Sequence, residues 1–381
     1  MNTSLSPSTL TWARAAASLS AAELADAVGA TLEEVEHWEA TGEIELDLVP
    51  KLAEKTRLPF GYLFLPDPPT TKLPISDFRR IADKEPPPPS RRLLSVLYRC
   101  QRRQRWYREY LIDNDAKPLP FVGSKTVKSS VMDVAKEIST TVRIGAKYNR
   151  GADTWEKTMA QSIENIESAG IIVSKIGYSD EYTHNTLSVE EFRGFALSDN
   201  YAPLVFVNGA DALPAQMFTL AHEIVHIWLG ESAVSNLNKT YSGTGEIERF
   251  CNSVAAEILV PMEELNREWN KSKPAGAEIS RLSKEFRVSK IVIARRGRDS
   301  GFLSQRFYDR IYKAQLAVAA KKRGGGNYYD TKPYEASRRL SVAIINDIRN
   351  GRTMYREAMT LLGVGSMTIL GRYAETLKLS L

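Results

Sequence analysis

The feature that most constrains the fold is a strongly apolar segment, from about Pro214 to Leu229, with polar side chains at its centre. The spacing of the apolar residues predicts a helix that is buried on nearly all sides. His222, Glu223 and His226 interrupt this pattern. Because unpaired burial of polar groups costs several kcal/mol, the three side chains are either core residues satisfied by hydrogen bonds or parts of a functional site.

The spacing of the two histidines favours a metal site. His222 and His226 are four residues apart, so they share one face of a helix. Two neutral imidazoles at this separation can bind one zinc ion, and Glu223 beside them has the position of a general base acting on a zinc-bound water. The sequence therefore predicts a zinc centre of the HExxH type.

A catalytic zinc ion requires a third protein ligand. Only two other histidines occur, His37 and His184, and both fall outside the region of the motif. We therefore expect a carboxylate ligand from the next predicted helix, at about 246–259. The candidates there are Glu246, Glu248 and Glu257.

The geometry of that helix favours Glu248. Glu248 and Asn252 are four residues apart and share a face, so one can bind the metal while the other bonds the distal nitrogen of a ligating histidine. Glu257 points to the opposite side, and Glu246 at the helix start favours the positive end of the helix dipole. We predict Glu248 as the third ligand, Glu257 as its main competitor and Asn252 as the supporting residue.

Three β-type segments precede the metal motif, at Gly170–Ile176, Phe192–Ser198 and Leu204–Asn208. A sheet edge above a metal cleft can accept an extended peptide as an added strand. We expect either Phe192–Ser198 or Leu204–Asn208 to form this edge, an arrangement that fits peptide hydrolysis.

Length and composition limit the class of protein to which the chain can belong. The 381 residues allow about two to four structural units. No apolar run approaches the ~20 residues that span a membrane, and no signal peptide is recognisable at the N-terminus. The two cysteines, Cys100 and Cys251, lie far apart, which argues against a disulfide framework. We expect a soluble, cytoplasmic protein with no membrane partner.

Residues 1–70 predict an all-helical unit. Ser20–Glu23 and Thr31–Glu34 are capping boxes that open two short helices, and Gly29 and Gly42 end them. Two helices joined by such a turn form a helix-turn-helix, followed by a further helix at about 47–56. The second of the two carries four glutamates and no cation. Since phosphate contacts dominate DNA affinity, we favour a protein partner over DNA for this unit.

The rest of the chain predicts an α+β protein with further helical parts. We expect a linker and helical connector over 71–140, a zinc peptidase domain over 141–270 and a basic helical region over 271–381. The connector includes a stiff proline segment at 86–89 and a basic helix from Arg91 to about Asp113. Helices are also expected at about 127–140 and 153–169, and a flexible glycine segment at Arg323–Asn327.

Charge is distributed unevenly along the chain. Residues 1–70 carry 4 basic and 11 acidic side chains, whereas residues 271–381 carry 23 basic and 9 acidic ones. The two ends can attract each other or meet different partners, unless both are simply solvated. Two sets of cations can contact nucleic acid or can simply be solvated. They are Arg102, Arg103 and Arg105 in the connector helix, and Lys290, Arg295 and Arg296 in the helical segment Ile279–Arg296.

Taken together, these residues resemble the ImmA/IrrE family of metallo-endopeptidases. The resemblance rests on the repressor-type (XRE-like) helix-turn-helix, on Phe218–His226 and on Glu248–Pro261 with its Asn252 and Ala255-Ala256-Glu257 block. Over the peptidase region it spans roughly 140–270, and Gly61–Pro69 and Gly324–Lys332 are also similar to longer members.

The resemblance implies a gluzincin-like fold in which His222, His226 and Glu248 hold zinc and Glu223 is base and acid. It also implies cleavage of a regulatory protein, such as a repressor or a toxin or antitoxin partner encoded nearby, in mobile-element or stress responses. The alternative is a DNA- or protein-binding regulator or antitoxin whose metal site is not used for cleavage.

Overall fold

A computed structural model describes residues 2–17, 19–56, 58–69, 73–78, 89–149, 154–178, 186–235, 245–319 and 335–380. The chain forms two compact units, Met1–Pro74 with Pro86–Leu97, and Ile75–Glu85 with Tyr98–Leu381. Four features discussed above lie outside the described residues: His184, most of the proline segment, the glycine segment at 323–327 and the similar stretch at 324–332.

The first unit is mainly helical. Its elements in chain order are β1 (Asn2–Ser4), α1 (Pro7–Ala16), α2 (Ala21–Val28), α3 (Leu32–Thr41), β2 (Glu43–Glu45), the 3-10 helix η1 (Leu46–Leu48), α4 (Val49–Thr56) and the 3-10 helix η2 (Phe60–Phe64). The two short strands pair antiparallel. They were not predicted, because three-residue strands carry too little alternation to detect.

Local capping explains the boundaries of α2 and α3. Ser20 and Thr31 each form a complete capping box with the glutamate three residues later. Gly29 and Gly42 adopt the left-handed conformation that ends a helix. Trp38 is buried in the core of the unit. The predicted helix boundaries in this region are confirmed.

The second unit contains a mixed five-stranded sheet. Its strands are β3 (Ser76–Phe78), β4 (Ile172–Ile176), β5 (Gly194–Leu197), β6 (Leu204–Asn208) and β7 (Ala233–Ser235), in the spatial order β3-β7-β5-β6-β4. The β4–β6 and β3–β7 pairs are parallel, whereas β5 pairs antiparallel with β6 and β7.

This strand order corrects one prediction. The predicted strands exist, but β5 and β6 both lie inside the sheet, so neither is the edge that we expected. The edges are β3 and β4. The error arose because β3 and β7, which cover that side of β5, are three residues long and leave no strand pattern in the sequence.

The helices of this unit follow the sequence pattern closely. They are α5 (Arg91–Asp113, which begins in the first unit), α6 (Val131–Val142), α7 (Ala146–Asn149), α8 (Trp155–Ser168), α9 (Leu213–Leu229), α10 (Glu246–Leu259), α11 (Met262–Glu268), α12 (Ala275–Glu285), α13 (Lys290–Asp299), α14 (Gln305–Ala319), α16 (Arg338–Arg349), α17 (Tyr355–Leu362) and α18 (Met367–Thr376). The predicted mixed α+β class is confirmed. In the part of the chain that the structure describes, no helix has the length and apolarity needed to cross a membrane.

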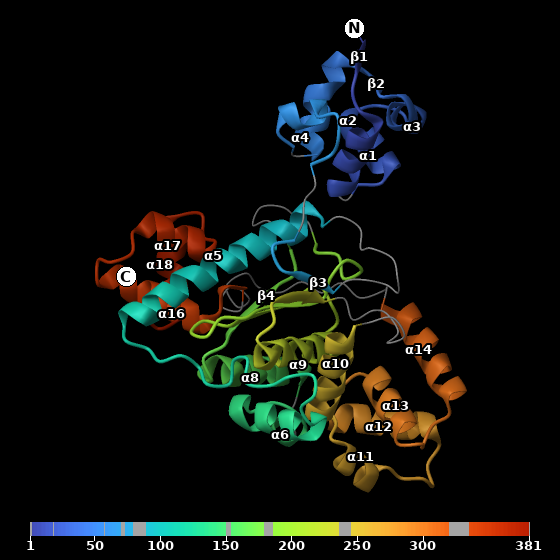
Figure 1. The fold of residues 1–381 in the computed structure, drawn as a ribbon, viewed down its shortest axis with the longest axis vertical. Helices are drawn as coiled ribbons and strands as arrows, with labels where there is room; N and C mark the ends of the chain where they lie inside the picture. The colour runs from blue at the N-terminus through green and yellow to red at the C-terminus, as the bar shows by residue number, and fades with distance from the viewer. Residues whose placement is uncertain are drawn as a thin grey trace. The chain divides into compact units, whose positions relative to one another are not determined.

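The main core lies between the sheet and the helices beneath it. Helix α9 packs on β5 and β6, α8 packs on β4, and α10 packs on α9 and α6 (Figure 1). Nearly the whole of α9 is buried, as its apolar sequence predicts. The two cysteines form no disulfide, as expected, and both are buried.

Two of the arginines considered above as possible nucleic-acid contacts are buried inside the protein. The guanidinium of Arg103 is 1% exposed and donates to the carbonyl oxygens of Leu361 and Glu335. Arg296 is also buried, where it donates to Val260 O and pairs with Glu257. Neither side chain can reach a surface ligand, so these two candidates for nucleic-acid contact are excluded.

Candidate metal centre

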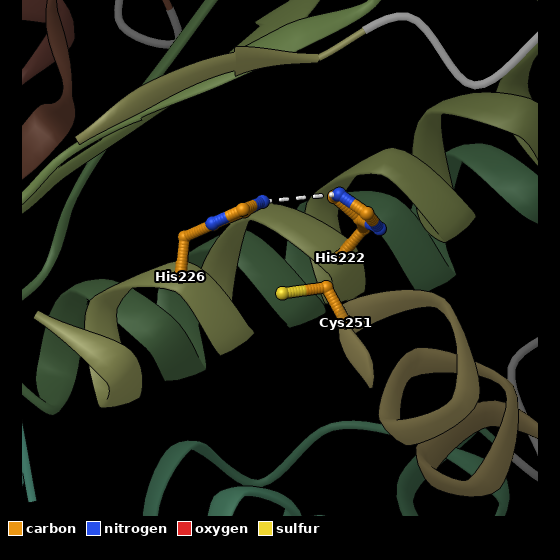
Figure 2. Close-up of side chains that lie close together, drawn as sticks. All are labelled: His222, His226 and Cys251. Atoms are coloured by element: carbon orange, nitrogen blue, oxygen red, sulfur yellow. Dashed lines mark hydrogen bonds between the residues drawn. The ribbon is translucent and has the colours of Figure 1, made fainter. Parts of the chain in front are cut away.

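The two histidines of α9 point toward one another on the side of the helix that faces the sheet (Figure 2). Their Nε2 atoms are 3.2 Å apart, and both side chains are fully buried. The four-residue spacing produces this geometry because successive turns of one helix face stack above each other. One ring nitrogen of each histidine is therefore directed at the same small region inside the core.

Glu248 of α10 completes this cluster. Its Oε1 lies 3.1 Å from His226 Nε2, and its Oε2 lies 3.4 Å from His222 Nε2. Ligand atoms on a tetrahedral zinc ion are about 3.3 Å apart, given metal–ligand distances of about 2.0–2.1 Å. The three separations match this spacing, so the donor set fits one small cation between two imidazoles and a carboxylate.

Electrostatics keep this carboxylate charged. Burial opposes ionisation of Glu248, but the charge of His222 and hydrogen bonds from both histidines lower its pKa well below the ordinary value. Burial also lowers the pKa of His226, although Glu248 acts in the opposite direction. An anionic carboxylate beside neutral imidazoles is the state that binds a divalent cation.

Cys251 of α10 offers a sulfur donor near the histidines. Its Sγ and one ring nitrogen of each histidine lie within 4.8 Å of one another, so His222, His226 and Cys251 also form a possible metal-binding group. In Figure 2 the thiol approaches from α10, away from the line that joins the two Nε2 atoms. Burial and then the nearby Glu248 and Glu223 raise the pKa of this thiol well above its usual value. Glu248, whose oxygens lie 3.1 and 3.4 Å from the histidine nitrogens and whose pKa is lowered, is the candidate donor that ionises more readily.

Glu223 occupies a buried position beside the cluster. Its side chain is fully buried, and neither carboxylate oxygen has a hydrogen-bond partner within the described structure. Burial, followed by repulsion from Glu248, raises its pKa well above the ordinary value, and the nearby Ser235 hydroxyl opposes this shift. A buried carboxyl group without a protein partner requires another explanation, and a cation or a reacting group beside it supplies one.

The other predicted candidates lie elsewhere. Glu257 pairs with Arg296 and accepts a hydrogen bond from Met262 N, as its opposite helix face implied. Asn252 is buried on the metal side of α10, but its Oδ1 has no hydrogen-bond partner, and neither has His222 Nδ1. The supporting role of Asn252 stays a prediction. Glu246 is in the first turn of α10, where it is exposed to solvent.

Sequence reasoning missed two residues that shape the site. Gly194 of β5 lies against Glu223, because an added Cβ there would be 2.9 Å from Glu223 Oε1. Ser235 of β7 acts on the same carboxyl group, because its nearby hydroxyl lowers the pKa of Glu223. A glycine at the start of an otherwise apolar strand was the only available signal, since glycine in a strand can mark a close approach of another group.

The site and the comparisons define a class of protein. Residues 181–297 match the family described as the IrrE N-terminal-like domain, a range that contains both histidines, Glu223 and Glu248. A stretch of 91 residues is 35% identical to the radiation response metalloprotease IrrE of Deinococcus radiodurans. These matches support the ImmA/IrrE family and a metallopeptidase function for this region.

The similarity is partial. The match covers 23% of this chain and 28% of the length of the Deinococcus protein. At the C-terminal end, residues 336–376 match a second family, which is described as a domain of unknown function, DUF8813. The comparisons therefore concern the metal-site region and leave the function of the other parts open.

Proposed function

We propose that this protein is a zinc-dependent endopeptidase that cleaves a regulatory protein. The observation that carries the proposal is the convergence of His222 Nε2, His226 Nε2 and the Glu248 carboxylate to within 3.1–3.4 Å. The proposed ligands are these three side chains, in a gluzincin-like arrangement. Two nitrogens and one carboxylate oxygen are a typical catalytic zinc set, because they leave one position open.

Each residue has a defined part in the proposed reaction. A bound zinc ion supplies Lewis acidity and lowers the pKa of water. Glu223 takes a proton from the attacking water and returns it to the amine that leaves. Its burial and raised pKa suit this role, because they make the carboxylate a stronger base toward a proton. Asn252 is proposed to support the ligand geometry from α10.

The regulatory substrate follows from the family resemblance. We propose a repressor, or a toxin or antitoxin partner, as the protein that is cut. The first unit, with its repressor-type α2 and α3, is proposed to dock a protein, because the exposed side of α3 carries Glu33, Glu34 and Glu36. Such a surface repels the phosphates of DNA.

Metal analysis and one substitution test the proposal. Protein purified without chelator is expected to contain about one zinc ion per chain. Glu223→Gln should keep this zinc and lose cleavage of a proteome-derived peptide library, measured by labelling of new N-termini and mass spectrometry. A zinc-free native protein, or a Glu223→Gln variant that still cuts, contradicts the proposal.

A matched pair of variants separates the two possible third ligands on α10. Glu248→Gln is expected to lower zinc occupancy strongly, because it removes the anionic donor. Cys251→Ser should keep its zinc, because the thiol is not a ligand in the proposed set. Glu257→Gln on the same helix is the control for charge removal. Zinc loss in Cys251→Ser together with zinc retention in Glu248→Gln would assign the site to the thiol instead.

A further inference from the structure

The C-terminal helices form a three-helix arrangement that the peptidase chemistry does not use. Helix α16 is followed by α17 and α18, which are joined by the four residues from Gly363 to Ser366 (Figure 1). Gly363 ends α17 in the left-handed conformation, with a φ of 66°. Two helices joined by a turn of three or four residues that contains glycine are the framework of a helix-turn-helix.

The burial pattern makes α18 an amphipathic second helix. Leu370, Tyr373 and Ala374 are buried, and Tyr373 is hydrogen-bonded to Ser341 of α16 through its hydroxyl. The other side of α18 presents Thr368 and Arg372 to solvent, together with Met367, which is 47% exposed. One face of α18 is therefore fixed to the other two helices, and the opposite face is available.

The exposed surface of these helices is basic. Apart from Arg339, six cations are exposed and take part in no ion pair within the described residues: Arg338, Arg349, Arg352, Arg356, Arg372 and Lys378. The exposed acidic residues of α17 and α18 are Glu357 and Glu375. A buried Asp347 accepts a hydrogen bond from Thr353, so it does not neutralise this surface. An excess of exposed cations on neighbouring helices, with no ion pair within the described residues, is the electrostatic pattern of a polyanion-binding site.

Gly371 is an independent sign that something approaches α18. It lies in the middle of the helix, and an added Cβ would meet no atom within 4 Å. Packing inside the protein therefore does not require glycine, although glycine weakens a helix interior. Gly371 is partly exposed, and glycine at such a position permits close approach of another surface to the backbone.

Hydrogen bonds connect the three helices to the rest of the second unit. Arg103 of α5 donates to Leu361 O near the end of α17 and to Glu335 O just before α16. Arg339 of α16 donates to Tyr107 of α5 and to the Glu167 backbone carbonyl of α8. The basic surface is thus presented on a fixed support.

We propose that α16–α18 are a DNA-binding helix-turn-helix, with α18 as the helix that enters the major groove. Thr368 and Arg372 face base edges, and Gly371 lets the helix backbone approach the groove floor. Arg349, Arg352, Arg356 and Lys378 contact phosphates on either side. This assigns duplex DNA binding to the C-terminal segment, in contrast to the acidic α3 of the first unit.

Salt dependence of binding by the full-length protein tests the proposal. Four phosphate contacts give a slope of log affinity against log salt of about −3.6, or roughly a 100-fold loss of affinity between 50 and 200 mM salt. The double variant Arg352→Gln/Arg356→Gln should reduce the slope to about −1.8. Fluorescence anisotropy with a mixed-sequence duplex measures both values.

A control variant removes the same number of positive charges from two exposed lysines outside α16–α18. Lys128→Gln/Lys136→Gln is expected to bind DNA like the wild type. Equal losses in the control and in the arginine variant overturn the proposal, as does the absence of binding to the duplex at 50 mM salt. In the latter case, binding to a labelled poly-glutamate peptide that the arginine variant loses would identify an acidic protein as the partner.

Variants of α18 test groove contact. On a duplex selected from a random pool by the full-length protein, Arg372→Ala should weaken binding about 5- to 150-fold. Gly371→Glu should fold normally, because an added Cβ meets no atom within 4 Å, yet lose DNA binding by obstruction and charge repulsion. Its thermal unfolding temperature should be equal to or above that of the wild type. Unchanged affinity in a folded Gly371→Glu variant excludes α18 as the reading helix.

Discussion

Gly194 shows how one residue on a strand fixes a side chain on a facing helix. A Cβ at this position would lie 2.5 Å from Thr219 Cγ2, 2.8 Å from the backbone oxygen of Phe206 and 2.9 Å from Glu223 Oε1. These separations are far below ordinary contact distances, and the Phe206 oxygen belongs to the neighbouring strand and cannot move alone. Only glycine therefore allows Glu223 to lie against the sheet in its observed position.

Gly194→Ala is accordingly expected to reduce peptide cleavage about 100-fold, because a displacement near 1 Å costs about that factor in a catalytic site. Zinc content should be retained, since the substitution contacts none of the proposed ligands. Overpacking should also lower the free energy of unfolding by roughly 1–3 kcal/mol. The control is Gly276→Ala, where no atom lies within 4 Å of an added Cβ. Full activity in Gly194→Ala would show that Glu223 does not depend on this contact.

At the scale of elements, α5 is the support of the C-terminal helices. The basic, aromatic sequence of this helix suggested an exposed connector, but the helix contributes Arg103 to the interior. Burial lowers the pKa of its guanidinium, and the carbonyl of Leu361 near the C-terminal end of α17 is a favourable acceptor for a cation. A local charge pattern cannot reveal such a contact, because its partners lie 232 and 258 residues away.

Arg103→Leu should therefore detach α16–α18 selectively. Loss of the guanidinium leaves the carbonyl oxygen of Leu361 without its donor and leaves Glu335 O with only the Ser174 hydroxyl, at a cost of about 1–3 kcal/mol. Hydrogen–deuterium exchange should rise in α16–α18 and remain unchanged in α9 and α10. The exposed neighbour Arg102→Leu is the matched control. An equal rise in hydrogen–deuterium exchange throughout the second unit, or no rise at all, would contradict the role of Arg103 in holding these helices.

At the scale of the whole molecule, Glu167 connects global stability to pH. This residue of α8 is buried and accepts a hydrogen bond from the backbone N of Arg339. Burial raises the pKa of Glu167 from 4.5 to about 7, although hydrogen bonds from Ser337 and the backbone oppose the shift. The other titratable groups close to it are Arg339, whose guanidinium donates to the Glu167 backbone carbonyl, Tyr107 and Tyr373. The protonated carboxyl group is thus the form that the folded state favours.

The stability that Glu167 contributes is therefore fully present below about pH 4.5 and is lost as the pH rises to about 7. The difference is on the order of 3 kcal/mol. Calorimetry of Glu167→Gln should show a smaller decline of the unfolding temperature between pH 5 and 8 than in the wild type. The exposed Glu164→Gln on the same helix should behave like the wild type. Parallel pH profiles for all three proteins would remove Glu167 as the cause.

The sequence alone determined the local parts of this protein. Capping boxes and glycines defined α2 and α3, and the apolar run with its four-residue histidine spacing defined α9 and the centre of the site. Helical phase on α10 also separated Glu248 from Glu257, because a helix fixes the direction of each side chain relative to its neighbours. These features depend on contacts within a few residues, which periodicity records.

Only the tertiary structure decided which surfaces meet. It placed β3 and β7 beside β5, buried Arg103 and Arg296, and brought Gly194 against Glu223. Each of these outcomes depends on pairing between segments that are distant in sequence, and the residues involved have no local pattern that names their partners. The apolar sequence at 213–229 predicted a buried polar site. The packing of α10 and β5 around this helix determined the geometry of that site.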